Sequence, residues 1–581
     1  MNRFFKGCLI FFIGMVIGVL ALTVGTVVIC VSMLSSTKTK VEKNSYLIVD
    51  FDGEITERQT TEWKDLIGAD SNQMQLLDYL RAIENAAEDP NIIGIIINGD
   101  KTFYTRSHAE EMSAVLKKFS GYEKPIYAWL SHGQNSNYYL CLNADKIYMP
   151  DTVSASLSLQ GYSITSPYFK NMFDKAGIHA DVIHIGDYKG SGENYSRDKM
   201  SNELRSSYIK VFDNIHDGLV NTIAADRHIS RNALIRIMSS GDTVMMSPQT
   251  AKSEGFIDEL MNYDEMKRQI IGKNNSISIA KYASTVKEPT GTNKIAVIYA
   301  EGTIVQGKSG SSRNYETLIG DRTFCNDIAE IAADKTVKAV VLRINSPGGS
   351  ALASELMLQE LTRLQKSKPI YVSFGPMAAS GGYYISCVPG VKVFTTENTI
   401  TGSIGVLSMA FNIEGLSEKL GINFETVKKY KYDDIFSASR KMNEDERQMI
   451  IRSMLGTYRE FTEHVTEARG IDQSRLESLA QGRIWTGRQA IDNGLATHQG
   501  GLLNTLRTAA SENGLSGYSL VTYPKPTSII DELLDSTSAR LTRSGVRNAA
   551  KETKTLERMV DYYLINSNAV SLYEPYIEAV K

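Results

Sequence analysis

The sequence is poor in cysteine, and its few cysteines are scattered. Five occur among 581 residues with no CxxC or CxxH spacing: Cys8, Cys30, Cys141, Cys325 and Cys387. Structural zinc sites and thioredoxin-like motifs use such closely spaced pairs, so the pattern argues against both. An odd, sparse set cannot form a disulfide framework. We therefore expect buried free thiols.

The sequence also lacks an excess of charge of either sign. It has 63 lysines and arginines against 66 aspartates and glutamates, a formal net charge of −3. Such a balance provides no excess positive field for phosphates, so it gives no support to a nucleic-acid partner. With 42% hydrophobic residues and only 13 prolines, a disordered or collagen-like chain is ruled out.

Charge is absent altogether from one stretch near the N-terminus. The 28 residues from Gly7 to Leu34 carry no charged side chain, which suffices to cross a hydrocarbon core of about 30 Å. This predicts one transmembrane helix within an anchor segment, residues 1–40. A cleaved signal peptide is the alternative, but its apolar region is shorter and ends at a small-x-small site. The flanking positive charges are nearly balanced and leave the orientation open.

The rest of the chain contains one unit written twice. The run SYLIVDFDGEI from Ser45 resembles KIAVIYAEGTI from Lys294, and MSPQTAKSEGFID from Met246 resembles WTGRQAIDNGLAT from Trp485. Because these and the intervening matches keep their order, we predict two repeats. Their expected bounds are 41–272 and 294–510, with a polar linker at 273–293 and a mainly helical C-terminal extension at 511–581 that contains TLERMVDYYL.

Within each repeat, short runs rich in valine and isoleucine alternate with amphipathic stretches such as ALASELMLQELTRLQK, residues 351–366. Strands that alternate with helices favour an α/β fold with mainly parallel sheets.

Two glycine-rich turns of the second repeat could carry chemistry. SPGGS, residues 346–350, follows a predicted strand and could present backbone N–H groups to an anion, although a tight turn would look the same. MAASGGYY, residues 377–384, could place Ser380 on a cramped strand-to-helix turn with an exposed hydroxyl, although a helix N-cap would also suit serine. The first repeat has NGDKTF instead of NSPGGS, and Asn135 instead of Ser380. Both features are therefore missing from the same copy, which favours a functional role.

A serine nucleophile needs a base. His464 and His498 have no obvious carboxylate partner, so we favour a lysine whose pKa burial lowers toward neutrality. Lys189 in GDYKGSGE and Lys431 in KKYKYDDI occupy equivalent places in the two repeats. Two aspartates, Asp433 and Asp434, follow Lys431 and would keep it charged, so the residues favour Lys189.

Together SPGGS, AASGGYY, TGSIGV and the DYK segment resemble the signal peptide peptidase A (protease IV) family, in its long, duplicated bacterial form. SPGG is also weakly similar to Clp protease and to the crotonase-like fold. The resemblance implies two tandem crotonase/Clp-protease-like domains and a membrane-bound serine endopeptidase with a Ser-Lys dyad, which needs neither metal nor cofactor. It maps the nucleophile to Ser380, the base to Lys189 and a base-orienting serine to Ser403. The oxyanion donors map to the N–H groups of Gly349 and Gly381, with Gly348 left open and Lys431 as the alternative base.

The resemblance also implies partners and a location. The substrates would be residual signal peptides and similar apolar peptides, and the chain would form a homo-tetramer. It would be a single-pass protein of the bacterial inner membrane with its catalytic part on the extracytoplasmic (periplasmic) side. Two other functions stay open: a crotonase-like acyl-CoA enzyme and a catalytically inactive membrane scaffold.

Overall fold

Each repeat builds its own parallel sheet. The computed structural model describes residues 39–51, 55–58, 74–100, 105–287, 290–311, 317–525 and 571–573. All strands of the first sheet are parallel. Its spatial order is β8 (Glu259–Leu260), β5 (Lys146–Met149), β3 (Ile126–Trp129), β2 (Ile92–Asn98), β1 (Ser45–Asp50) and β9 (Asn275–Ser278).

The second sheet repeats this order strand by strand. It runs β21 (His498–Gln499), β17 (Lys392–Thr395), β16 (Ile370–Ala379), β14 (Val337–Ser346), β10 (Lys294–Glu301) and β22 (Ser519–Tyr523). Beside β16 it adds β18 (Ile400–Gly402) and the antiparallel β20 (Ile484–Thr486). The expected α/β fold with mainly parallel sheets is confirmed, since β20 is the one antiparallel member among the described strands of these two sheets.

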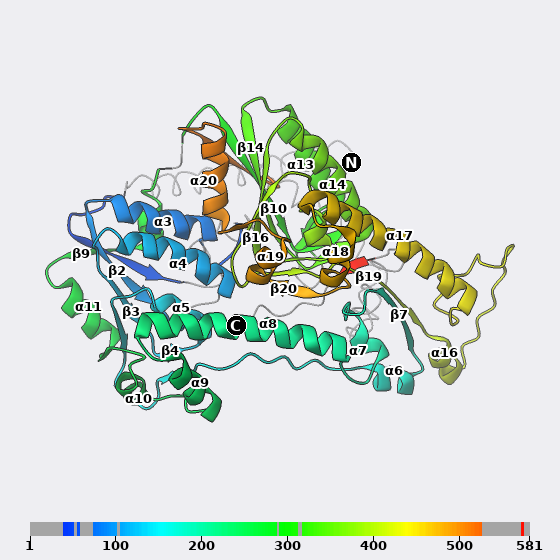
Figure 1. Cartoon of the computed structure of the whole chain (residues 1–581), viewed down its shortest axis with the longest axis horizontal. Helices are drawn as coiled ribbons and strands as arrows, with labels where there is room; N and C mark the ends of the chain where they lie inside the picture. Colours follow the sequence, from blue (N-terminus) through cyan, green and yellow to red (C-terminus); the bar gives the residue numbers. More distant parts are fainter. Residues whose placement is uncertain are drawn as a thin grey trace, which may run out of the picture.

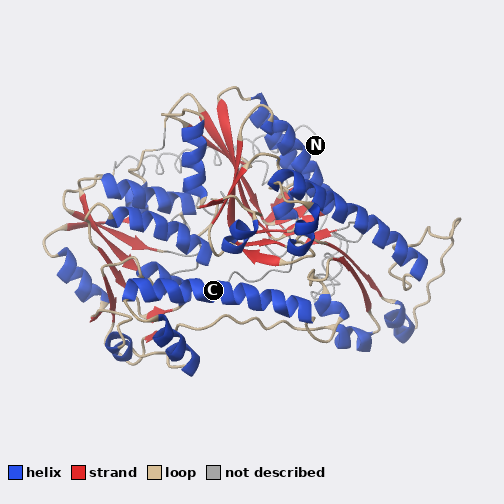
Figure 2. Cartoon of the chain, viewed as in Figure 1, coloured by secondary structure: helices blue, strands red, loops and turns tan. Residues whose placement is uncertain are grey.

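The helices that connect these strands lie partly on the faces of the sheets and partly at the end of the molecule far from the first sheet (Figures 1 and 2). In the first repeat they are α3 (Leu76–Glu88), α4 (Arg106–Ser120), α5 (Asn135–Cys141), α6 (Lys170–Ala176), α7 (Glu193–Ser196), α8 (Asn202–Arg227), α9 (Arg231–Ser240), α10 (Pro248–Ser253), α11 (Tyr263–Ile271) and α12 (Ile279–Ala283). In the second they are α13 (Asp321–Ala333), α14 (Ala351–Gln365), α15 (Gly381–Tyr384), α16 (Glu414–Leu420), α17 (Glu444–Arg469), α18 (Gln473–Leu479), α19 (Gly487–Asn493) and α20 (Leu502–Glu512).

Two stretches differ from the domain bounds expected from the sequence. The segment 273–293 contains β9 and α12, and β9 extends the first sheet by pairing with β1. The segment 511–581 contributes β22 to the second sheet, where it pairs with β10. A polar sequence did not exclude a strand here, because an edge strand is solvated on one side. The helix expected at TLERMVDYYL lies outside the described residues.

The predicted anchor also lies outside the described residues, since the description begins at residue 39. Within the described part, no helix combines the length and the apolar character needed to cross a bilayer.

One apolar core joins the two repeats. Side chains of α3, α4 and α20 pack between the first sheet and one face of the second, and this buried cluster runs from Leu47 and Ile95 to Val297 and Val341. The other face of the second sheet is covered by α13, α14 and α17. Because the repeats share this core, each is held at a set position relative to the other.

A third sheet crosses from one repeat to the other. It consists of β12 (Gly310–Ser311), β13 (Thr317–Gly320), β11 (Thr303–Val305), β15 (Gly348–Ser350), β23 (Ser571–Tyr573), β19 (Val406–Asn412) and β7 (His179–Ile185). Strand β7 belongs to the first repeat, yet it pairs antiparallel with β19 of the second over seven residue pairs. A small separate sheet pairs β4 (His132–Gly133) with β6 (Ser156–Leu157).

Candidate active site

Ser380 stands at a strained strand-to-helix turn. It follows β16 and caps α15, with φ 54° and ψ −117°, a region that residues other than glycine seldom adopt. Its backbone N–H donates to the carbonyl oxygen of Gly402 at 2.9 Å, which holds the turn against β18. A cramped strand-to-helix turn at Ser380 is therefore present, as the sequence predicted. The side chain, however, is fully buried rather than exposed.

Glycines let the backbone of the neighbouring turn come close to Ser380. Gly349 has φ 148°, and a Cβ there would lie 2.0 Å from the carbonyl oxygen of Ile304. A Cβ on Gly381 would lie 3.2 Å from the nitrogen of Gly349, so the two backbones are adjacent. Gly381 opens α15, where first-turn amides have no acceptor within the helix. By contrast, the N–H of Gly348 donates to Ser346 Oγ at 3.2 Å.

The amine of Lys189 lies between two buried serines. Its Nζ donates to Ser380 Oγ at 2.8 Å, to Ser403 Oγ at 2.7 Å and to the carbonyl oxygen of Ser403 at 3.0 Å. All three residues have no solvent-exposed surface. Ser403 has φ 53° and is held by its N–H, which donates to the carbonyl oxygen of Arg483 at 2.7 Å. The structure thus brings together residues from both repeats.

The pairing of β7 with β19 delivers Lys189 to this place. Ile185 at the end of β7 pairs with Val406, three residues after Ser403. The chain then turns through Gly186 to Lys189, and a Cβ on Gly482 would lie 2.4 Å from the Lys189 nitrogen. Only a glycine allows the two backbones this close. The segment around Gly482 is a part of the site that the sequence motifs did not reveal.

Helix α8 packs against strands of the second repeat next to Ser380 and Ser403. Its apolar side chains Leu204, Tyr208, Val211 and Ile215 form a buried cluster with residues of the second repeat on β16, β18 and β20: Met377, Ala379, Ile400 and Ile484. Figure 1 shows α8 running beneath both repeats toward β7. The cluster therefore fixes α8 on β16, β18 and β20, the strands next to Ser380 and Ser403, and Lys189 lies in the loop between β7 and α7 that precedes α8.

The other candidate bases lie elsewhere. Lys431 is on the surface, with 61% of its side chain exposed, and its Nζ donates to Asp445 Oδ2 at 2.7 Å. That hydrogen bond raises the pKa of Lys431 above its usual range, so the amine stays charged. Its partner is Asp445 and not the expected Asp433 or Asp434.

The two histidines also differ from expectation. His464 does have a carboxylate partner, because its Nε2 lies 3.0 Å from Glu355 Oε2. Glu355 lies 109 residues away in the sequence, which is why no local pattern revealed it. His498 lies in the short strand β21, not in a loop.

In the first repeat, the position equivalent to Ser380 is occupied by Asn135, whose side chain binds backbone groups. Its Nδ2 donates to the carbonyl oxygen of Gln160 at 2.9 Å, and its Oδ1 accepts from the Gln160 N–H at 3.1 Å. This amide closes the turn by pairing with backbone, which a nucleophile would not do.

A short strand of the C-terminal segment lies between two strands of the site. The short strand β23 pairs antiparallel with β15, Gly349 opposite Leu572, and also with β19, Leu407 opposite Ser571. An extended segment of chain thus lies between the glycine turn and the strand that leads from Ser403. Backbone pairing of this kind binds peptides with little regard to side chains.

A buried ionic cluster ties the repeats together beneath the site. Arg343 on β14 donates through Nη2 to Glu57 Oε1 at 2.8 Å and to Glu111 Oε1 at 2.7 Å. Both carboxylates belong to the first repeat, and all three side chains are at most 2% exposed. Against the effect of burial, Arg343 and His108 lower the pKa of Glu57 to about 2. No sequence motif marks this cluster, because its members are far apart in the chain.

Comparison with known proteins agrees with the geometry. The model of peptidase family S49 matches residues 118–275 and 362–516. Protease 4 of Salmonella typhi is 30% identical over 84% of this chain and 82% of its own length. The chloroplastic serine protease SPPA of Arabidopsis thaliana is 28% identical over 85% of this chain and 73% of its own.

A shorter relative matches about one repeat. The putative signal peptide peptidase SppA of Enterococcus faecium is 34% identical over 42% of this chain and 70% of its own length. Among solved structures, a ClpP1 mutant of Listeria monocytogenes covers 37% of this chain with 11% identity and a TM-score of 0.24, too low to support the fold. The family match and the relatives that span most of the chain decide the assignment: the protein is a serine endopeptidase and belongs to peptidase family S49.

Proposed function

We propose that the chain hydrolyses peptide bonds with a Ser-Lys dyad formed by Ser380 and Lys189. The observation that carries this proposal is the 2.8 Å contact between Lys189 Nζ and Ser380 Oγ, with both side chains fully buried. Full burial favours the uncharged amine, because an ammonium ion loses its hydration there. Ser403, which accepts from the same amine at 2.7 Å, orients it toward the serine.

In the proposed reaction, Lys189 takes the proton of Ser380, and the alkoxide attacks the carbonyl carbon of the substrate. The N–H groups of Gly349 and Gly381 stabilise the oxyanion, and one such donor contributes roughly 10²-fold in turnover. The protonated lysine then gives its proton to the leaving amine. A water, deprotonated by the same lysine, releases the acyl group from Ser380.

The proposed substrates are extended apolar peptides, including residual signal peptides. The place of β23 between β15 and β19 supports an extended binding mode beside Ser380. Apolar substrates agree with the net charge of −3, which steers neither acidic nor basic ligands strongly.

We further propose that residues 1–40 anchor the chain in the bacterial inner membrane, with the catalytic part on the extracytoplasmic side. The uncharged run from Gly7 to Leu34 supports the anchor by its length. A groove held next to the bilayer would meet apolar peptides as they leave it. Removal of residues 1–40 should shift the protein from the membrane fraction to the soluble fraction on ultracentrifugation.

We also propose that the chain assembles as a ring, with four copies as the family resemblance implies. Helix α6 of the first repeat begins at Lys170 and its counterpart α16 begins at Glu414, an offset of 244 residues. The same offset makes residues 423–429 the counterpart of β7. It also makes residues 162–168 the counterpart of β19. Neither 162–168 nor 423–429 belongs to a strand in the described part of the chain.

Pairing of 423–429 with the partner subunit's 162–168 would repeat, between copies, the contact that β7 makes with β19 within one chain. The exposed side chains of Phe424 and Val427, 53% and 94% exposed, would be covered by it. A head-to-tail contact of this kind closes into a ring where the rotation allows. It would bring Lys431 toward the partner subunit's Asn135, which is no nucleophile.

A serine-reactive phosphonate probe tests the dyad. The full chain should be labelled, and Ser380→Ala and Lys189→Ala should lose labelling and peptide hydrolysis by a factor of at least about 10². Lys431→Ala is the matched control and should keep both. Labelling that survives Ser380→Ala would refute the nucleophile. Loss in Lys431→Ala but not in Lys189→Ala would assign the base to Lys431, and an unlabelled full chain would favour the inactive scaffold or the acyl-CoA enzyme.

A further inference from the structure

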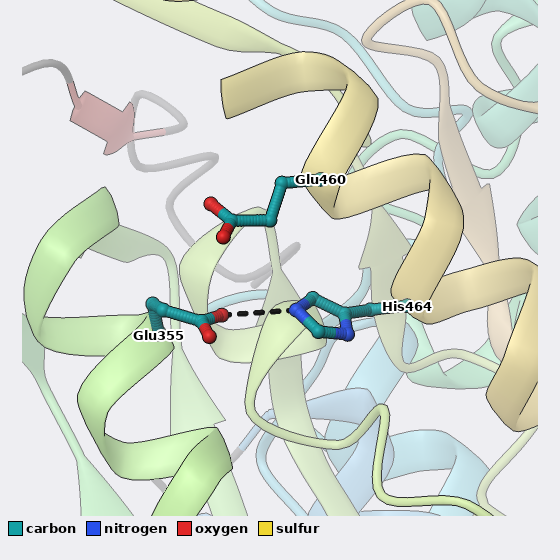
Figure 3. A group of neighbouring side chains, drawn as sticks. All are labelled: Glu355, Glu460 and His464. Carbon is teal, nitrogen blue, oxygen red and sulfur yellow. Dashed lines mark hydrogen bonds and ion pairs between the residues drawn. The ribbon is translucent and has the colours of Figure 1, made fainter. Parts of the chain in front are cut away.

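A group of metal-ligating side chains lies outside the Ser380 site. Glu460 and His464 stand one turn apart on α17, and Glu355 faces them from α14 (Figure 3). One possible ligand atom from each residue lies within 4.8 Å of the other two. Positions four apart in a helix share one face, which is why Glu460 and His464 point toward the same partner.

The first carboxylate of the group is held in place by several donors. Glu355 Oε2 accepts from Tyr384 Oη at 2.7 Å and lies 3.0 Å from His464 Nε2, and Glu355 Oε1 accepts from Gln359 Nε2 at 2.6 Å. These hydrogen bonds lower the pKa of Glu355 to about 2 in spite of its burial. The side chain is therefore a fixed, ionised ligand whose orientation other residues determine.

The second carboxylate is left without compensation. Glu460 makes no hydrogen bond or ion pair within the described part of the chain, and Figure 3 shows its carboxylate turned toward Glu355. Two carboxylates and one imidazole thus converge on one place.

We propose that Glu355, Glu460 and His464 form a binding site for a divalent cation of the Zn²⁺ class. One imidazole and two carboxylates are a donor set that suits Zn²⁺ and similar ions, whereas Mg²⁺ prefers oxygen alone. Bonds of about 2.0–2.2 Å require the three groups to close slightly, and the exposed Glu460 is free to move. Binding releases the Nε2 proton that His464 donates to Glu355, and the dication and the two carboxylates then sum to zero charge. The hydrogen bonds to Glu355 supply the outer shell that such sites need.

The site would stabilise the short helix α15 through Tyr384. This tyrosine ends α15, the helix that Ser380 caps and Gly381 begins, and its ring packs edge-on against His464 at 5.4 Å between centroids. A cation that fixes Glu355 and His464 also fixes Tyr384. We expect bound Zn²⁺ to raise the melting temperature and to leave the Ser-Lys chemistry itself unchanged, since Glu355, Glu460 and His464 do not touch the dyad.

Titration of the intact, metal-free chain with Zn²⁺ by calorimetry tests the site, with Co²⁺ absorption as a second readout of the ligand geometry. The full chain should bind one equivalent more tightly than His464→Ala or Glu460→Gln, by at least about tenfold. Glu463→Gln removes the same charge from the neighbouring position on α17 and should keep the affinity. Mg²⁺ at the same concentration should not compete.

Equal Zn²⁺ affinity and stoichiometry in the full chain, His464→Ala and Glu460→Gln would overturn the proposal. An equal loss of Zn²⁺ affinity in Glu463→Gln would also overturn it, because the loss would then follow from the change in net charge and not from a lost ligand. Since Glu460 is exposed, Glu460→Gln is expected to fold even if His464→Ala does not. Melting temperatures without metal will show this directly.

Discussion

At the scale of single residues, the site stores backbone strain on both sides of one amine. Ser380 and Ser403 have positive φ angles of 54° and 53°, and both contact Lys189 Nζ. Such a conformation costs on the order of 1–3 kcal/mol per residue and persists only where the surroundings hold it. The amides of both serines are held by carbonyl groups of neighbouring strands and loops. The strain serves to aim two hydroxyl groups at one nitrogen.

Ser403→Ala should lower kcat by about tenfold or more and leave KM nearly unchanged. The variant removes the hydroxyl that accepts from Lys189 at 2.7 Å but leaves the substrate groove intact. Steady-state kinetics on a peptide substrate measure both constants. Ser367→Ala, an exposed serine in the turn after α14, provides the control. A rise in KM alone would mean that Ser403 contacts substrate and does not position the base.

At the scale of elements, the contacts between α4 and the loop after β17 link the two repeats. Glu110 on α4 accepts from the N–H and the side-chain amide of Asn398, and it lies 3.9 Å from Arg106. Burial nevertheless raises the pKa of Glu110 to about 7. The folded protein therefore holds a proton that the unfolded chain releases near pH 4.5. Stability from this contact falls as the pH rises between these two values.

Glu110→Gln should therefore stabilise the protein at pH 8 and have little effect at pH 4.5. A glutamine oxygen still accepts one of the two hydrogen bonds from Asn398 and the side chain carries no charge to bury, so the variant avoids a cost on the order of 3 kcal/mol at pH 8. Melting temperatures of both proteins between pH 4.5 and 8 measure the difference. Glu203→Gln, at an exposed position on α8, controls for the loss of a charge. Parallel pH profiles for wild type and Glu110→Gln would contradict the raised pKa.

At the scale of the whole molecule, the first repeat contributes structure to the second. Strand β7 of the first repeat pairs with β19 of the second, and Lys189 contacts Ser380. Because the chain is duplicated, the second repeat has a segment equivalent to β7. That segment, 423–429, ends beside Lys431.

Phe424→Asp should prevent assembly into the proposed ring while the labelling of Ser380 persists in each chain. The charge would be placed in the segment 423–429 that another copy covers in the proposed ring, at a side chain 53% exposed in the single chain. Light scattering of the detergent-solubilised protein gives the mass of the assembly. Exchange of an exposed polar neighbour, Glu425→Ala, should preserve it. An unchanged mass in Phe424→Asp would refute this contact.

Local patterns were sufficient for much of this protein. The duplication, the parallel α/β fold and the turn at Ser380 follow from the order of apolar runs and from glycines that only certain turns require. The same patterns were weak at the edges, because β9 and β22 are short edge strands in polar sequence. They also gave no sign of the pair formed by His464 and Glu355, because the two residues are 109 positions apart in the chain.

The sequence by itself determined which residues could act as nucleophile and which two lysines could serve as base. Only the tertiary structure shows which of the two lysines lies beside Ser380, because Lys189 and Ser380 are 191 residues apart and meet through the register of β7 on β19. The equivalent Lys431 remains at the surface beside Asp445. Strand register depends on the packing of whole elements, such as α8 against β16 and β18, and no short segment contains that information.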